Sequence, residues 1–115
     1  MHAQDILIDD VILLQLKDKS LDVSNAADFK TMGLEYIDSG HHNILLDISE
    51  VEFIDSSGLG VMVFLSKSVK KKGNFGVCSA RPEVTKIIML TRLDRVFHVF
   101  ETVEQGLTAF GVSST

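Results

Sequence analysis

The feature that most constrains the fold is the apolar segment at residues 43–48, Asn-Ile-Leu-Leu-Asp-Ile. Its nearly continuous apolar centre is typical of a β-strand that is covered on both faces, as the strands of parallel sheets are. Segments with the three- and four-residue apolar spacing of amphipathic helices stand before and after it. Strands that alternate with helices in this way predict an α/β fold built on a mostly parallel sheet.

The remaining elements follow in a regular order. We expect strands at residues 6–8, 11–16, 43–48, 74–79 and 96–100, and helices over residues 26–37, 61–72, 82–91 and 103–110. Asp22 or Ser24 is the expected N-cap of the first helix. Only Asp9 and Asp10 separate the first two strands, so these two should be antiparallel. The predicted order is therefore ββαβαβαβα, a sheet of four to five strands with about four helices.

The length of 115 residues suits a single domain, residues 1–115, with its core over about residues 5–111. A formal net charge of −5 argues against a direct nucleic-acid partner, which requires clustered Lys and Arg. One basic cluster exists, at Lys67 and residues 70–72. It falls at the end of a predicted helix, where cations interact favourably with the helix dipole. A solvated helix end is thus favoured there over an anion-binding or membrane-binding patch.

Cysteine and histidine give no sign of metal or catalytic chemistry. The single cysteine, Cys78, excludes an intrachain disulfide and a cysteine-based zinc site, and its apolar neighbours predict a buried thiol. The histidines are His2, His41, His42 and His98, and none has the spacing of a metal site or a catalytic triad. We therefore expect no metal, no cofactor and no catalytic residue.

The N-terminus lacks the basic region and apolar stretch of a signal peptide. The longest unbroken apolar run in the middle of the chain, residues 61–65, is too short to cross a bilayer. These two observations predict a cytoplasmic protein that does not insert into a membrane.

The candidate functional site is the motif Asp55-Ser56-Ser57-Gly58-Leu59-Gly60, which stands between a β-rich run and a helical segment. Function in parallel sheets usually lies at the carboxyl ends of the strands. A serine nucleophile would need a nearby base, and the elbow pattern G-x-S-x-G is missing. A nucleotide site is disfavoured because both glycine-rich signatures are missing and Asp55 would repel phosphates.

Helix capping by Asp55 or Ser56 is the simplest interpretation of the motif. Capping explains one polar residue, but it does not explain Ser57 beside Gly58 and Gly60, which leave little bulk around a hydroxyl. We interpret the motif as a regulatory serine presented at a helix N-terminus.

Residues 54–61, Ile-Asp-Ser-Ser-Gly-Leu-Gly-Val, resemble the phosphorylation motif of the STAS family, the anti-sigma factor antagonists. The order of elements is also similar to that family, as are Leu21-Asp22 before the first helix and the segment 90–97. The likeness covers about residues 5–111. One position departs from it, since Ser20 stands where many members have a glycine.

The resemblance implies a partner switch. Ser57 would be phosphorylated, with Ser56 as the alternative acceptor. The partner-binding residues would be Asp22, Ser24, Asp55, Ser56, Ser57, Gly58 and Leu59. The unphosphorylated form would bind a serine kinase that is also the anti-sigma factor, with the histidine-kinase-like ATPase fold. Phosphorylation would release this partner and a serine phosphatase would reset the switch, so the chain would be no enzyme itself.

Two alternatives stay open at this point. The same switch could control a signalling target other than a sigma factor, such as an enzyme that regulates biofilm formation. The chain could instead be an accessory subunit of a transport assembly with a STAS fold. The intact second serine favours a phosphorylation switch, because a purely structural role needs no hydroxyl at Ser57.

Overall fold

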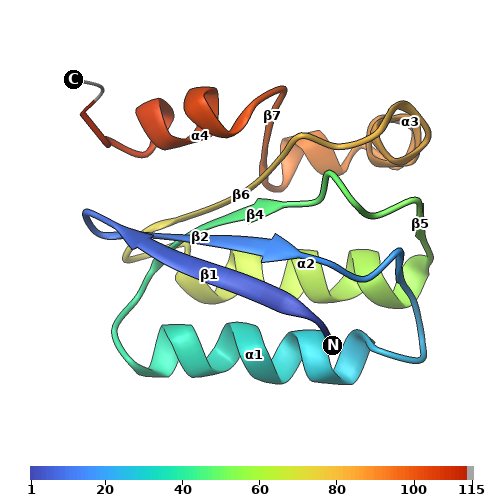
Figure 1. Ribbon diagram of the computed structural model, residues 1–115, viewed down its shortest axis with the longest axis horizontal. Helices are drawn as coiled ribbons and strands as arrows, with labels where there is room; N and C mark the ends of the chain where they lie inside the picture. The colour runs from blue at the N-terminus through green and yellow to red at the C-terminus, as the bar shows by residue number, and fades with distance from the viewer. Residues whose placement is uncertain (114–115) are drawn as a thin grey trace.

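A computed structural model of the chain describes residues 1–113, so the last two residues of the predicted domain, 114–115, lie outside the described part. Figure 1 shows the elements in chain order. They are β1 (Ala3–Ile8), β2 (Val11–Leu16), β3 (Ser20–Leu21), α1 (Ala26–Asp38), β4 (Asn43–Asp47), β5 (Phe53–Ile54), α2 (Ser56–Val69), β6 (Asn74–Cys78), α3 (Pro82–Leu90), the short 3-10 helix η1 (Leu93–Arg95), β7 (His98–Phe100) and α4 (Val103–Ala109).

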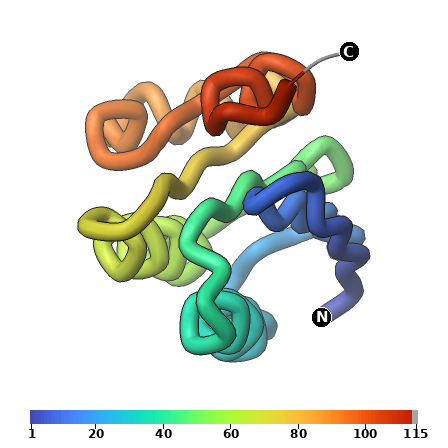
Figure 2. Tube along the Cα trace, turned by 90° about the vertical axis from the view of Figure 1, so that its left-hand side faces the viewer, coloured from blue at the N-terminus to red at the C-terminus, as the bar shows by residue number. Residues whose placement is uncertain are grey.

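The main sheet has five strands in the order β1-β2-β4-β6-β7. β1 is antiparallel to β2, and the other neighbours pair in parallel. Helices α1 and α2 cover one face of this sheet, and α3 and α4 lie on the other (Figures 1 and 2). The predicted α/β architecture with an antiparallel first strand is therefore confirmed.

Side chains of the central strands alternate between two hydrophobic cores. From β4, Ile44 and Leu46 enter the larger core beneath α1 and α2, whereas Leu45 packs with Phe110 on the α4 side. All three leucine and isoleucine side chains of this strand are at most 1% exposed. The continuous apolar run is thus explained by burial on both faces. Cys78 is also fully buried, as predicted, and burial raises the pKa of its thiol to about 12.

A second, two-stranded sheet was not predicted. β3 and β5 pair in parallel, with Ser20 opposite Phe53 and Leu21 opposite Ile54. Strands of two residues are too short to show a period in the sequence. This small sheet holds residues 20–21 directly beside the strand that leads into α2.

Several helix and strand boundaries differ from the prediction; β1 begins at Ala3 rather than at residue 6, and α2 ends at Val69 rather than at residue 72. α2 begins at Ser56. The sequence predicted a start at residue 61, because Gly58 and Gly60 are typical of a loop. Asn25 occupies the N-cap position of α1, without a side-chain capping hydrogen bond, so the expectation of Asp22 or Ser24 as its N-cap was wrong. The last strand begins only at His98, because Arg92 has a left-handed backbone (φ 61°) and opens η1 just before it.

Candidate functional site

Asp55 organises the N-terminus of α2. It is the N-cap residue, and its Oδ1 accepts hydrogen bonds from the backbone N–H groups of Ser57 (2.8 Å) and Gly58 (3.1 Å). The first N–H groups of a helix have no partner within the helix, and an N-cap side chain supplies one. Ser56 and Ser57 therefore occupy the first turn of a capped helix, with Ser56 exposed and Ser57 partly exposed.

The second oxygen of Asp55 connects the motif to a distant segment. Oδ2 accepts a hydrogen bond from the backbone N–H of Val23 (3.1 Å), and the backbone N–H of Asp55 donates to the carbonyl of Leu21 (3.0 Å). Both carboxylate oxygens are thus engaged by backbone groups. The structure in this way brings residues 21–23, which include Asp22, against the motif.

Gly58 allows this close approach. A Cβ atom at this position would lie 2.8 Å from the Leu21 carbonyl oxygen and 2.9 Å from the Leu21 Cβ. Gly60 is different, because a Cβ there would meet no heavy atom within 4 Å. The first glycine of the motif is therefore required for packing, whereas the second leaves an open patch of surface.

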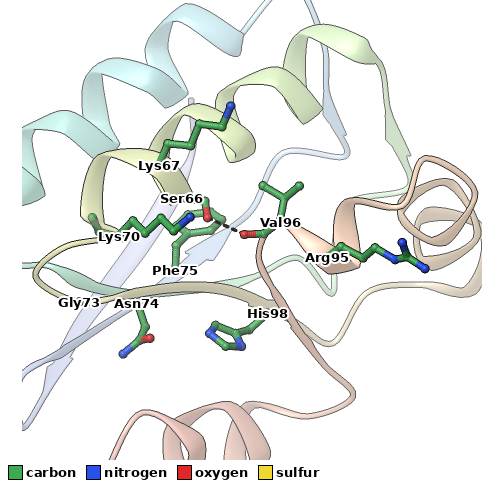
Figure 3. Close-up of a pocket in the computed structure, with 10 residues that line it drawn as sticks. Ser66, Lys67, Lys70, Gly73, Asn74, Phe75, Arg95, Val96 and His98 are labelled. Carbon is green, nitrogen blue, oxygen red and sulfur yellow. Dashed lines mark hydrogen bonds between the residues drawn. The ribbon is translucent and has the colours of Figure 1, made fainter.

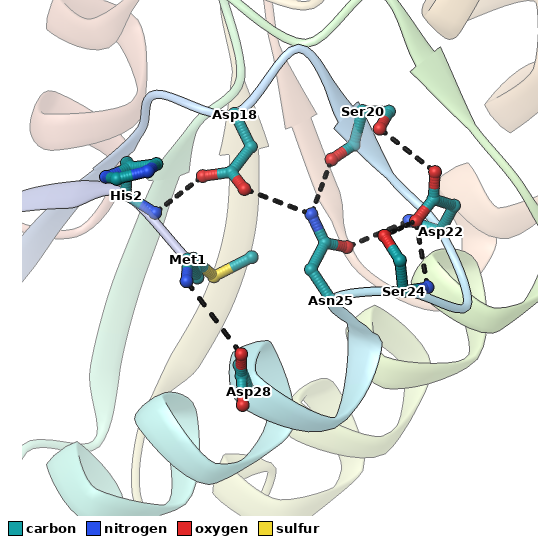
Figure 4. Close-up of polar contacts among 8 residues, drawn as sticks. All are labelled: Met1, His2, Asp18, Ser20, Asp22, Ser24, Asn25 and Asp28. Atoms are coloured by element: carbon teal, nitrogen blue, oxygen red, sulfur yellow. Dashed lines mark hydrogen bonds and ion pairs between the residues drawn. The ribbon is translucent and has the colours of Figure 1, made fainter.

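Asp22 lies at the centre of a polar turn before α1 (Figure 4). One of its carboxylate oxygens accepts from the backbone N–H and the hydroxyl of Ser24, and the other accepts from the hydroxyl of Ser20 (3.0 Å). These hydrogen bonds, those from Ser24 first, lower the pKa of Asp22 below its ordinary value. The site thus holds an oriented, ionised carboxylate at the surface.

Asn25 was not predicted as a site residue, although it orders the turn. Its side-chain oxygen accepts from the Asp22 backbone N–H (3.0 Å), and its amide donates to the Ser20 carbonyl (2.8 Å) and to Asp18 (3.2 Å). The cluster of Ser, Asp and Asn at residues 18–25 was the available signal, because these side chains commonly bond to nearby backbone in turns.

The remaining expected partner-binding residues divide into two groups. Ser24 and Ser56 are exposed at the surface. Leu59 is only 9% exposed and packs into the larger core, so its side chain holds the helix rather than facing outward. Two apolar side chains that the sequence did not single out are exposed next to the site, Val23 at 78% and Phe53 at 54%.

The site offers little for catalysis. Across residues 1–113, no histidine forms a hydrogen bond to the motif, and the Asp55 oxygens already accept from three N–H groups. That same described part of the chain contains no cluster of three or more metal-ligating side chains. Nor does any of its helices have the length and apolar character needed to span a bilayer. The arrangement presents two serine hydroxyls at a helix N-terminus, between an oriented carboxylate and exposed apolar groups.

Comparisons with known proteins agree with this geometry. A family model described as the STAS domain matches residues 4–106. A protein of Thermotoga maritima named "Putative anti-sigma factor antagonist" is 35% identical over 103 residues, which are 88% of this chain and 90% of that protein. The crystal structure of an anti-sigma factor antagonist from Mycobacterium paratuberculosis aligns with a TM-score of 0.87 at 25% identity, over 95% of this chain and 92% of that one.

A third comparison extends the likeness in fold. The Bacillus cell fate determinant SpoIIAA, in its phosphorylated form, aligns with a TM-score of 0.71 at 17% identity, over 94% of this chain and 98% of that one. A sequence identity of 17% shows only that the two proteins share a fold. Because the family model covers most of the sequence and its relatives keep the same architecture, this chain belongs to the STAS domain family.

Proposed function

We propose that this protein is an anti-sigma factor antagonist that acts as a partner switch. Its unphosphorylated form binds a protein that is both a serine kinase and an anti-sigma factor, and phosphorylation of Ser57 releases that protein. The observation that carries the proposal is the position of Ser57 in the first turn of α2, beside an Asp55 carboxylate whose oxygens accept from backbone N–H groups. Because Asp55 is used for capping, it is not a base for the serine, and the hydroxyl is available to an external kinase.

The charge of a phosphate explains how the switch releases its partner. Phosphorylation adds a charge of about −1.5 to −2. The dipole of α2 stabilises an anion at its N-terminus by roughly 0.3–1 kcal/mol, so the fold tolerates the modification. A partner surface that fits a neutral hydroxyl between Asp22 and Asp55 would meet a bulky dianion instead. A penalty of about 3 kcal/mol for burying it corresponds to roughly hundredfold weaker binding.

The contact surface follows from the exposed groups around Ser57. Asp22, Ser24, Asp55 and Ser56 supply polar contacts, while Gly58 and Leu59 hold the helix in place from beneath. The exposed side chains of Val23 and Phe53 add apolar area next to them. Apolar contacts beside a few oriented polar groups are the usual composition of a protein interface.

The same proposal includes the remaining components. The kinase has the histidine-kinase-like ATPase fold, a separate serine phosphatase restores the hydroxyl, and the exchange takes place in the cytoplasm. The chain is a substrate and a ligand, without a catalytic residue or a cofactor of its own. In support, SpoIIAA, which shares this fold, has a structure in a phosphorylated form.

The test is a pull-down with wild-type protein, Ser57→Ala and Ser57→Asp, followed by mapping of phosphorylated residues after addition of ATP. We expect wild-type and Ser57→Ala to capture the same kinase, Ser57→Asp to capture little, and only wild-type to be phosphorylated. Ser56→Ala is the matched control and should behave as wild-type. Phosphorylation of Ser57→Ala would assign the acceptor to Ser56.

The identity of the captured proteins separates the alternatives. A kinase with a target other than a sigma factor would keep the switch but change its output. Transporter subunits without any kinase would contradict the proposal and favour an accessory role in a transport assembly.

A further inference from the structure

A hollow of about 360 Å³ lies at the opposite end of α2 from Ser57 (Figure 3). Lys67 and Lys70 line it from α2 and its C-cap, Asn74 from β6, Arg95 from η1, and His98 from β7. Its apolar part is formed by residues 69, 75 and 96, which are Val, Phe and Val. A volume of this size is at the lower end of the range for sites that bind small molecules.

The charge of this hollow is unusual for an acidic protein. Among the described residues, no carboxylate lines it, although the chain has 16 Asp and Glu residues against 11 Lys and Arg. Within residues 1–113, Lys67, Arg95 and the lysines at 70–72 form no ion pair, since the three ion pairs found there involve other cations. Figure 3 shows the Lys70 amine directed toward the hollow, while the Lys67 amine and the Arg95 guanidinium extend away from its centre. The His98 ring packs against Phe100 and Phe110 at the edge of the hollow.

Interaction with the helix dipole does not account for the whole arrangement. Cations near the C-terminus of α2 are favourable for the helix, which explains Lys67 and Lys70. Arg95 and His98, however, belong to other elements and line the same hollow. A neighbouring hollow on the far side of these lysines is lined by Asp38, whose carboxylate supplies negative charge there. Of these two hollows, the one at His98 is lined by cations and neutral groups alone.

The walls of the hollow are fixed by contacts between elements. The Ser66 hydroxyl donates to the carbonyl of Val96 (3.1 Å), which ties α2 to the segment before β7. Asn74 donates its backbone N–H to the carbonyl of His42 (3.0 Å). Gly73 packs so closely on the same carbonyl that a Cβ would lie 2.0 Å from its oxygen. The site is thus formed before any ligand arrives, which lowers the entropic cost of binding.

We propose that this hollow binds the phosphate group of a small phosphorylated ligand, either a soluble organic phosphate or a lipid headgroup. Lys70 supplies a charge-assisted contact to the phosphate. Asn74, whose side-chain amide also donates to Asn43 (3.3 Å), and His98 line the same hollow. Lys67 and Arg95 raise the local positive potential and attract the anion. The site lies roughly 20 Å along α2 from Ser57, at 1.5 Å per residue. Ligand and switch partner therefore occupy separate surfaces, and this inference stands independently of the proposed partner switch.

The test uses the full chain and nuclear magnetic resonance spectra of its backbone amides. Three probes are added in turn: inorganic phosphate, glycerol 3-phosphate, and phosphatidylcholine vesicles with or without phosphatidylglycerol. We expect saturable shifts at Lys70, Asn74 and His98 and none at Ser57. Lys70→Gln should weaken binding about tenfold, as expected for loss of one charge-assisted contact. Lys86→Gln, at an exposed lysine of α3, makes the same charge change and should bind as wild-type.

The probes distinguish the source of the phosphate. Saturable binding of the soluble phosphates that depends on Lys70 supports a soluble ligand, and binding only to vesicles with phosphatidylglycerol, again dependent on Lys70, supports a lipid headgroup. Shifts that do not saturate at millimolar concentration, or equal binding by Lys70→Gln and Lys86→Gln, would overturn the proposal.

Discussion

The two ends of α2 use their charges in opposite ways. At the N-terminal end, the Asp55 carboxylate accepts hydrogen bonds from three backbone N–H groups and so joins the helix to the 21–23 segment. At the C-terminal end, Lys67 and residues 70–72 form no ion pair within the described part of the chain. The polar groups of the first end stabilise the fold that presents Ser57. The cations of the second end interact favourably with the helix dipole but have no ion-pair partner among residues 1–113, so they are available to a ligand.

The largest effects on stability are expected at the two glycines near the ends of α2, Gly73 and Gly58. Gly73→Ala should destabilise the protein by roughly 3 kcal/mol, because its Cβ would lie 2.0 Å from a backbone oxygen that cannot rotate away. Urea unfolding followed by circular dichroism measures the change in the free energy of unfolding. A loss below about 0.5 kcal/mol, the usual range of surface substitutions, would contradict the packing at this turn.

Gly58→Ala should cost about 2 kcal/mol, since its Cβ would meet both the carbonyl oxygen and the Cβ of Leu21. Gly60→Ala is the matched control, because Gly60 lies only two residues further along the same helix. With no heavy atom within 4 Å of its Cβ, it should stabilise the helix by about 0.5–1 kcal/mol. Equal shifts of the two urea midpoints would show that α2 does not press against β3 as described.

The next effect concerns the charges themselves. Asp55→Ala removes the cap and should cost about 1–2 kcal/mol in the free energy of unfolding. Lys70→Ala at the other end should change it by less than about 0.5 kcal/mol, because this side chain has no ion-pair partner to lose among residues 1–113. If the two substitutions cost the same, the contrast between the two ends would be wrong.

The smallest effect is a dependence on pH. The pKa of Asp22 is lower in the folded state than its ordinary value of 3.8. Its ionised form therefore stabilises the fold above that value, and this contribution is lost as the pH falls through the folded-state pKa. Asp22→Asn should reduce the loss of stability as the pH falls through and below 3.8, measured as urea midpoints. If the stability of Asp22→Asn changed with pH as that of wild-type does, the hydrogen bonds from Ser24 and Ser20 would not be lowering the pKa of Asp22.

Much of the fold could be predicted because burial on both sides of a sheet leaves a pattern in the sequence. The central strands β2, β4 and β6 lie within one or two residues of their predicted bounds. The β3–β5 sheet was not predictable, since two residues have no period. The start of α2 was placed late because Gly58 and Gly60 suggested a loop, although Gly58 is there to let the helix approach Leu21.

The candidate site was only partly predictable. The motif at residues 55–60 was visible through its unusual composition, and Asp22 entered through a resemblance. The sequence did not identify Asn25, Val23 and Phe53 as part of the site. Their places in it depend on how the turn before α1 packs beside β5. The hollow at the other end combines residues from α2, β6, η1 and β7. From the sequence alone, its lysines were interpreted as a solvated helix end.

The most direct test of the central claim is the affinity of the captured kinase for this protein before and after phosphorylation. The dissociation constant is measured for unphosphorylated protein and for protein phosphorylated by that kinase with ATP, using Ser56→Ala so that only Ser57 of the pair can react. Roughly hundredfold weaker binding after phosphorylation is predicted. Equal affinities of the two forms would contradict a switch at Ser57.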